Sequence, residues 1–304
     1  MLDKLGRGVK IAEEQREKRK HEGFLADLFK GKASLHLFFP WPEDTEENRA
    51  KMEAVAEELK KILKENVDPE TIDATKEIPL HLFEELSRKG FFALKVPEEY
   101  DGKALSQMGY AHIVGLASSY STAITILISA DNTIGVKFPI LKYGTEDQKK
   151  KYLPELTRWP SGFCFTERNV GSDPARMRTH ALRVKNQRGE IVGYEITGEK
   201  WYTTNAPLND REPLAKYLAV VAQIVDDPRE VGETPRFGIF IVPTSSQGVT
   251  IGSRNYFSGM HGIYNANPTF EKVFVSKDQL IGKEGEGFKI ALEALNTGRI
   301  AIAA

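Results

Sequence analysis

Apolar positions recur along this chain with two different periods, one in each half. From residue 46 onward the pattern is helical, because the apolar positions return every three or four residues and so share one face of a helix. These positions are Met52, Val55, Ala56, Leu59, Ile62 and Leu63. A second helix is expected to bury Leu82, Phe83 and Leu86 and to stop at Gly90.

The remainder of the first half also predicts helices. Residues 104–130 hold no Asp, Glu, Lys or Arg, but their serines, glutamine and histidine make them too polar for a membrane span. We therefore expect buried helices there and no integral membrane span. The stretch "TEDQ" has the pattern of a capping box, in which Thr145 and Gln148 each satisfy a free backbone N–H.

After Trp159-Pro160 the pattern changes to short β-favouring runs separated by Gly, Pro, Asn and Asp. The runs are "GFCFT", "THALRVK", "GYEITGEKWYTT", "KYLAVVAQIV", "FGIFIVP" and "TFEKVFV". Closely spaced strands without crossover helices predict an antiparallel barrel or sandwich. Beyond "SKDQLIGKEGEGF" the pattern is helical again, up to an apolar "RIAIAA" that is typical of a helix cut in its middle.

These patterns predict a multi-domain α and β protein. A charged N-terminal arm and extended segment would cover residues 1–35, and an all-α helical domain would cover 36–158. A β-barrel domain would follow at 159–281, and 282–304 would begin a truncated C-terminal helical domain. The charged stretch 11–22 favours a solvated helix or disordered arm over a nucleic-acid contact.

The composition of the chain argues against several classes of function. With 42 Lys and Arg against 43 Asp and Glu, no overall charge attracts nucleic acid or an anionic membrane. The single cysteine, Cys164, cannot form an intramolecular disulfide, which favours a cytoplasmic or other reducing compartment. The six histidines form no metal-binding pattern, and there is neither a Rossmann fingerprint nor a P-loop. An inert buried thiol is the favoured interpretation of Cys164.

Two stretches carry the candidate chemistry. "GFCFTERNVGSD" runs from an apolar strand into a Gly-Ser-Asp corner, and "GEKWYTTN" places aromatic rings beside two hydroxyls. Taken alone, the hydroxyl residues are ordinary strand and turn residues. If the two stretches lie side by side, they form a flat apolar wall edged by donors, which suits a planar heteroaromatic ring with a phosphate tail.

These two stretches resemble the motifs of a known family. "FCFTERNVGSD" is similar to a signature of the acyl-CoA dehydrogenases, and "GEKWYTTN" is similar to a second one. Three further segments match in the same order: "LSRKGFFALKVPEEYDGKALS", "YGTEDQKKKYLPEL" and "FEKVFVSKDQLIGKEGEGFKIALEALNTGR". The resemblance runs from about residue 26 to the end and is greatest to the very-long-chain branch.

The resemblance implies an α-helical domain, a β-barrel domain and a C-terminal helix bundle, with FAD between the last two. It implies that the chain introduces an α,β double bond into acyl-CoA thioesters, as in fatty acid β-oxidation. The implied cofactor-binding residues are Phe163, Cys164, Phe165, Thr166, Gly171, Ser172, Tyr202, Thr203 and Thr204. Thr166 would donate to the flavin edge, Thr204 would reach its N5, and Tyr202 stands where the family has a tryptophan. The implied substrate-binding residues are Ser172, Asn296 and Arg299.

The departures from the family concern the substrate more than the cofactor. Gly298 precedes Arg299 where a minority of the family has its catalytic glutamate, so we expect no catalytic base in these residues. Arg168 replaces a common proline. The implied partners are acyl-CoA, an electron-transferring flavoprotein and a second copy or more of the chain, as a homodimer or homotetramer. A non-catalytic scaffold, a nucleic-acid-associated relative and an oxidase that passes electrons to oxygen stay open as alternatives.

Overall fold

The computed structural model describes residues 23–302, apart from Ser34, Phe38, Pro42, Asp210, Arg211 and Thr234. The charged stretch 11–22 lies outside the described residues. The α-helices are α2 (Phe24–Phe29), α3 (Glu46–Asn66), α4 (Pro69–Thr75), α5 (Leu80–Arg88), α6 (Gln107–Ser118), α7 (Thr122–Ile134), α8 (Lys137–Tyr143), α9 (Glu146–Leu156) and α10 (Gly287–Ile302).

The helical half forms as its apolar spacing predicts. Helix α3 begins at the N-cap Thr45, and α5 is followed by Gly90 in the left-handed region at φ 74°. Thr145 and Gln148 form both bonds of the predicted capping box at α9. All but one of the predicted core positions of α3 and α5 are buried; Met52 is half-buried. The predicted all-α first half is confirmed.

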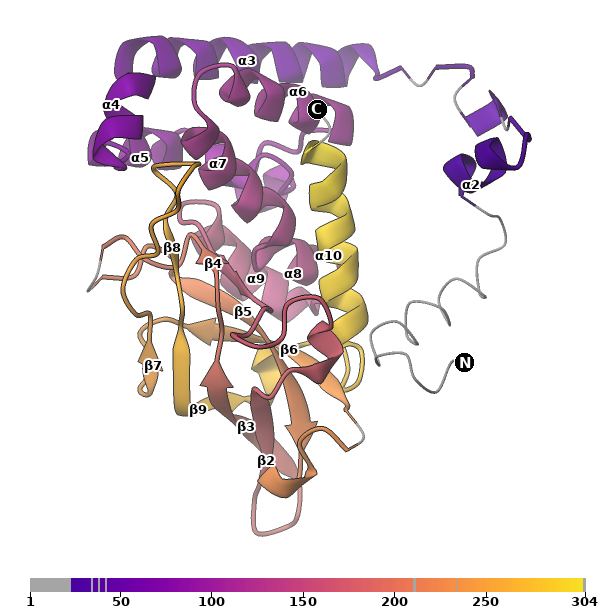
Figure 1. Ribbon diagram of the computed structural model, residues 1–304, viewed down its shortest axis with the longest axis vertical. Helices are drawn as coiled ribbons and strands as arrows, with labels where there is room; N and C mark the ends of the chain where they lie inside the picture. Colours follow the sequence, from indigo (N-terminus) through magenta and orange to yellow (C-terminus); the bar gives the residue numbers. More distant parts are fainter. Residues whose placement is uncertain are drawn as a thin grey trace.

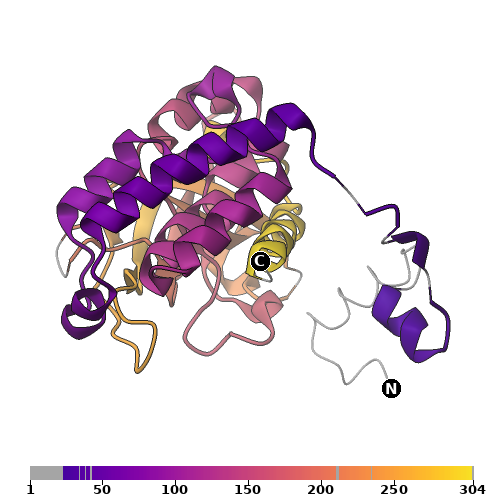
Figure 2. The same ribbon diagram turned by 90° about the horizontal axis from the view of Figure 1, so that it is seen from above.

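The described part of the N-terminal segment is less extended than the sequence predicts. It contains the short helix α2 and a 3₁₀ turn at Leu35–Leu37. In both views the segment lies apart from the body of the protein (Figures 1 and 2).

The second half forms one main sheet, built from strands that follow the β-favouring runs. The strands are β1 (Gly162–Cys164), β2 (His180–Lys185), β3 (Ile191–Glu199), β4 (Thr203–Thr204), β5 (Tyr217–Val225), β6 (Phe237–Pro243), β7 (Val249–Thr250), β8 (Asn265–Ala266), β9 (Thr269–Ser276) and β10 (Leu280–Ile281). The order in the main sheet is β10-β6-β5-β2-β3-β9-β7, with β1 also beside β5, while β4 and β8 pair separately. The predicted antiparallel barrel needs correction, because the sheet is open and two of its pairings are parallel.

The parallel pairings decide where the chain leaves the sheet. Strand β1 pairs with β5 from Leu218 to Val220, and β2 pairs with the same edge of β5 from Gln223 to Val225. Because β6 occupies the other edge of β5, β1 and β2 must lie one after the other along a single line. Residues 165–179 therefore leave the sheet and return to it. We call residues 165–179 the excursion.

Helix α10 packs against the sheet. It packs beside α7 and α8 and over β6, and in Figure 1 it is the yellow helix next to the helical domain. Its first residue, Gly287, lies directly on the backbone of Gly238 in β6. A Cβ at residue 287 would stand 2.4 Å from the Gly238 carbonyl carbon, which no packed structure tolerates without movement.

Gly287→Ala should therefore lower the free energy of unfolding by about 3 kcal/mol, because α10 must shift away from β6. Chemical denaturation of the variant measures this. Gly259→Ala is the matched control, since a Cβ there meets nothing within 4 Å. Equal stabilities of the two variants would contradict the close packing of α10.

Within the part of the chain that the structure describes, one segment, Thr122–Tyr143, is long and apolar enough to cross a membrane by length and composition alone. It spans α7 and α8, and most of it is buried inside the protein. A core helix passes the same test, so the segment is weak evidence for a membrane span.

Candidate functional site

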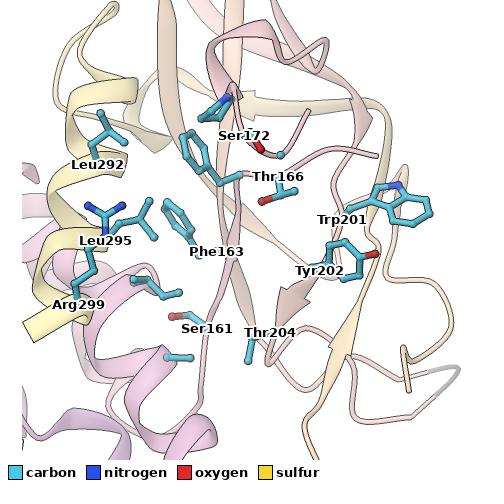
Figure 3. Close-up of a pocket in the computed structure, with 15 residues that line it drawn as sticks. Ser161, Phe163, Thr166, Ser172, Trp201, Tyr202, Thr204, Leu292, Leu295 and Arg299 are labelled. Carbon is cyan, nitrogen blue, oxygen red and sulfur yellow. The ribbon is translucent and has the colours of Figure 1, made fainter. Parts of the chain in front are cut away.

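A cavity of about 450 Å³ lies where the excursion, the segment after β3, α7 and α10 meet. Its walls combine apolar side chains with hydroxyls at several points and a single charged side chain, Arg299. The lining residues are Ala130, Ile134, Ser161, Phe163, Phe165, Thr166, Gly171, Ser172, Pro174, Trp201, Tyr202, Thr204, Leu292, Leu295 and Arg299. Figure 3 shows the α10 residues on one side of the cavity and Trp201 and Tyr202 on the opposite side.

The alternation of β1 and the residue after it decides which side chains reach this cavity. Phe163 and Phe165 point to the same side of the strand, with ring centroids 5.7 Å apart, and both line the cavity. Cys164 points to the other side, where its Sγ lies 3.5 Å from the Thr203 hydroxyl. Cys164 is buried, as the sequence predicts, and burial raises the pKa of its thiol to about 12, which disfavours the reactive thiolate.

The two threonines of β4 also point to opposite sides of their strand. Thr204 lines the cavity, whereas Thr203 is fully buried against Cys164 and lies outside the lining. Just before β4, Tyr202 adopts φ 59°, in the left-handed region that bulky residues rarely occupy. This backbone conformation is held by the Asn267 Oδ1, which accepts from the Tyr202 N–H at 3.0 Å. Strain of this kind is common at functional sites.

A buried ion pair closes the two ends of the excursion. The Glu167 carboxylate accepts from the backbone N–H of Arg178 at 2.6 Å and of Thr179 at 3.0 Å. It also accepts from the Lys200 Nζ at 3.0 Å, and both side chains are buried. One position beyond Lys200, the Trp201 N–H donates to the Thr166 carbonyl at 2.8 Å. The pair thus fixes the two predicted motifs against each other.

The environment of Glu167 keeps it ionised. Burial by itself raises the pKa of this carboxyl, but the Lys200 ammonium and the two backbone donors outweigh burial and hold the pKa below its usual 4.5. Burial also lowers the pKa of Lys200, against the opposing effect of Glu167.

This shift predicts a specific acid sensitivity. Because the Glu167 pKa is lower in the folded than in the unfolded chain, its contribution to stability is complete above about pH 4.5 and is lost as the pH falls below that value. Denaturation curves measured across this range should show a shallower loss of stability in Glu167→Gln than in the wild type. Parallel curves for the two proteins would contradict the role of Glu167.

A second buried pair fixes the start of β1. Asp131, at the end of α7, forms an ion pair with Lys137 of α8, and both are fully buried. Asp131 also accepts from the Ser161 N–H at 2.7 Å and from its hydroxyl at 2.8 Å. Burial raises the pKa of Asp131 and lowers that of Lys137. Ser161 lines the cavity, so this pair holds one of its walls.

The structure brings together most of the residues that the sequence predicted for the site, with the exceptions of Cys164, Thr203 and Asn296. Asn296 lies on α10 outside the lining, and its Oδ1 accepts from Arg299 at 2.7 Å. Sequence reasoning missed the two buried ion pairs. The only sequence signal for the pair of Asp131 with Lys137 was Asp131 itself, a charge directly after a long uncharged stretch. Among the described residues, no group of three or more His, Cys, Asp or Glu could hold a metal ion.

The fold is of a class in which a helical domain and an open mixed sheet lie side by side, and here both contribute to the lining of the cavity. The family model of the acyl-CoA dehydrogenase N-terminal domain matches residues 46–159, and that of the middle domain matches 162–273. The chain belongs to the acyl-CoA dehydrogenase family.

Three similar proteins illustrate the relationship. A probable acyl-CoA dehydrogenase of Mycobacterium tuberculosis, FadE10, is 36% identical over 97% of this chain and 43% of its own length. The human mitochondrial very long-chain specific acyl-CoA dehydrogenase is 31% identical over 94% of this chain and 43% of its own. A Bacillus anthracis acyl-CoA dehydrogenase complexed with FAD superposes with a TM-score of 0.66 at 27% identity, covering 86% of this chain and 41% of that one. The chain thus spans less than half the length of these relatives.

Proposed function

We propose that this chain forms the FAD-binding and acyl-CoA-binding part of an acyl-CoA dehydrogenase. The observation that carries the proposal is the cavity itself, which joins the motif around Phe163 and Thr166 to the motif around Tyr202 and Thr204. The two motifs are separated in sequence by the rest of the excursion and by β2 and β3, and a shared ligand gives their meeting a function.

The lining fits a flavin with its phosphate tail. The phenylalanine rings and the aliphatic residues of α7 and α10 offer flat apolar surface, and the hydroxyls of Thr166, Ser172 and Thr204 offer hydrogen-bond donors. Arg299 supplies the positive charge that an anionic group needs. No carboxylate is present among the lining residues, so nothing in this wall repels phosphate.

The chemistry that FAD supplies when bound is acceptance of a hydride from the β-carbon of an acyl-CoA whose α-proton is removed. The residues of this chain would position the two molecules and exclude water. Ile134, Leu292 and Leu295 form the apolar side that keeps the reacting carbons dry. Ser172 and Arg299 lie on opposite walls, where we propose that they contact the substrate together with Asn296.

We propose that the base that removes the α-proton comes from outside these walls. The absence of a carboxylate from the lining supports this. We further propose that the working protein is a cytoplasmic homodimer or homotetramer that passes its electrons to an electron-transferring flavoprotein, as the family resemblance suggests.

The proposal is tested with the native protein isolated intact from its own cells. Under anaerobic conditions, acyl-CoAs of several chain lengths are added while the visible flavin bands are recorded. We expect the bands to bleach with at least one chain length, and the rates will rank the substrates. A protein whose flavin is reduced by dithionite but by no acyl-CoA would contradict the proposed activity.

A further inference from the structure

Three asparagines form a continuous hydrogen-bonded chain behind the cavity wall. Asn267 and Asn255 exchange two bonds, of 3.0 and 3.1 Å, between their amide groups. The Asn255 Nδ2 also donates to the Asn265 Oδ1 at 2.8 Å, and the Asn265 Nδ2 donates to the Thr204 hydroxyl oxygen at 3.2 Å. Asn265 is buried, and the other two asparagines are half-buried. We call Asn267, Asn255 and Asn265 the asparagine relay.

A backbone group fixes the direction of every bond in this relay. The Tyr202 N–H can only donate, so the atom of Asn267 that faces it at 3.0 Å must be the carbonyl Oδ1. The Nδ2 of Asn267 then faces the Asn255 Oδ1, which leaves the Asn255 Nδ2 to donate to Asn265. The Asn265 Oδ1 is thereby occupied as an acceptor, and its Nδ2 must face Thr204. Reversal of any one amide would oppose two donors or two acceptors.

The direction of the relay determines which hydrogen bonds the Thr204 hydroxyl can still form. A hydroxyl has one proton to donate and two lone pairs to accept with, and here one lone pair is taken by Asn265. Among the described residues, Thr204 has no acceptor for its own hydroxyl proton. Since Thr204 lines the cavity, that proton is available to a ligand there.

We propose that Asn267, Asn255 and Asn265 are positioning residues that fix the Thr204 hydroxyl as a hydrogen-bond donor toward the ligand in the cavity. The ligand edge that meets Thr204 must then carry an acceptor, such as an unprotonated ring nitrogen. The identity of this ligand as FAD rests on the proposed function, whereas the direction of the relay depends on the protein alone.

The relay has a specific energetic role. In its absence the Thr204 hydroxyl could turn and present a lone pair to the ligand, and an acceptor that faces a lone pair loses its hydrogen bond. The relay excludes the rotamer in which the Thr204 proton points at Asn265, so fewer hydroxyl orientations compete when the ligand arrives, which lowers the cost of ordering on binding.

The test compares FAD dissociation constants for the wild type and a set of variants of the chain. Thr204→Val removes the donor, and Asn265→Asp offers a carboxylate that accepts the Thr204 proton and turns it away from the cavity. We expect each to bind FAD about tenfold more weakly, and the double variant to bind no worse than either one, because both changes abolish the same bond. Thr250→Val is the control, since Thr250 is an exposed residue of β7 outside the lining, and it should bind like the wild type.

Asn265→Leu covers the case in which a buried carboxylate prevents folding. Leucine leaves the Thr204 hydroxyl free to turn, and binding should then fall between the wild type and Thr204→Val. Additive losses in the double variant, or unchanged binding in both Asn265 variants, would overturn the proposal.

A second readout needs no ligand and separates this proposal from the proposed function. In the ligand-free protein, exchange of the Asn265 side-chain amide protons with solvent is followed by NMR. If the Nδ2 faces Thr204, Thr204→Val should accelerate the exchange of these protons, and Thr250→Val should not. Unchanged exchange in Thr204→Val would overturn the relay. A wild type that shows this protection but does not bind FAD would leave the relay standing and refute the proposed function.

Discussion

Lys200→Met is expected to lower the free energy of unfolding by about 3–5 kcal/mol, because it leaves the Glu167 carboxylate buried without its partner. The carboxylate would still accept from the backbone N–H groups of Arg178 and Thr179, but its charge would have no counterion. Because the pair joins the excursion to the segment that carries Tyr202 and Thr204, we expect ligand binding in the cavity to weaken as well. Chemical denaturation at neutral pH measures the loss of stability.

A matched control and a rescue make this result interpretable. Lys151→Met removes a partner of the ion pair with Asp278, in which both side chains are 60% exposed, and should cost at most about 1 kcal/mol. The double variant Glu167→Gln with Lys200→Met removes both charges and keeps an acceptor for the backbone donors. It should recover part of the lost stability. A cost in Lys200→Met no larger than in the control would show that the buried pair does not hold the excursion.

Asp131→Asn should have an effect of similar size, about 3–5 kcal/mol, because it leaves the fully buried ammonium of Lys137 unpaired. It also weakens the contact with Ser161, where β1 begins. Chemical denaturation measures the loss, and the double variant with Lys137→Met should restore part of it.

The pH dependence of Asp131→Asn gives an independent check. Burial lowers the pKa of Lys137 from its usual 10.5, so the unfolded chain binds a proton that the folded chain releases. The stability of the variant should therefore rise with pH toward about 10.5. A stability that is flat or falling over this range would show that Lys137 is not the destabilising group.

The local parts of the fold could be predicted from the sequence because their causes are local. The helix around Leu59 and the capping box at Thr145 follow from residues three or four positions apart. The strand around Phe163 likewise follows from a run of β-favouring residues. Such patterns record the period of an element, which is a property of neighbours in sequence.

The rest depends on contacts between distant residues, which no single stretch records. Parallel pairing of β1 and β2 along one edge of β5 turns the expected antiparallel barrel into an open mixed sheet, and it is decided by residues near 163, 181 and 220 together. Glu167 and Lys200 are 33 positions apart, and each is an ordinary charged residue in its own segment. The asparagine relay is invisible in sequence for the same reason, since its order follows from folding the loop before β8 against β4.

The two motifs of the site could be predicted from the sequence, but the complete set of side chains that line the cavity could not. The order of residues in "FCFT" indicates which side chains alternate, so Phe163 and Phe165 could be expected to share a wall. The contact between Cys164 and Thr203 on the other side of that wall could not be expected from the sequence. The predicted cofactor contacts of these two residues remain predictions, and the geometry gives their side chains no access to the cavity.

The most direct test of the central claim is an equilibrium titration of the purified chain with FAD, followed by the flavin absorption band. We expect saturable binding of one FAD per chain, and loss of that binding in Ala130→Trp, which fills the cavity from α7. Absence of saturable binding by the wild type, or equal binding by Ala130→Trp, would contradict the assignment of this cavity to the cofactor.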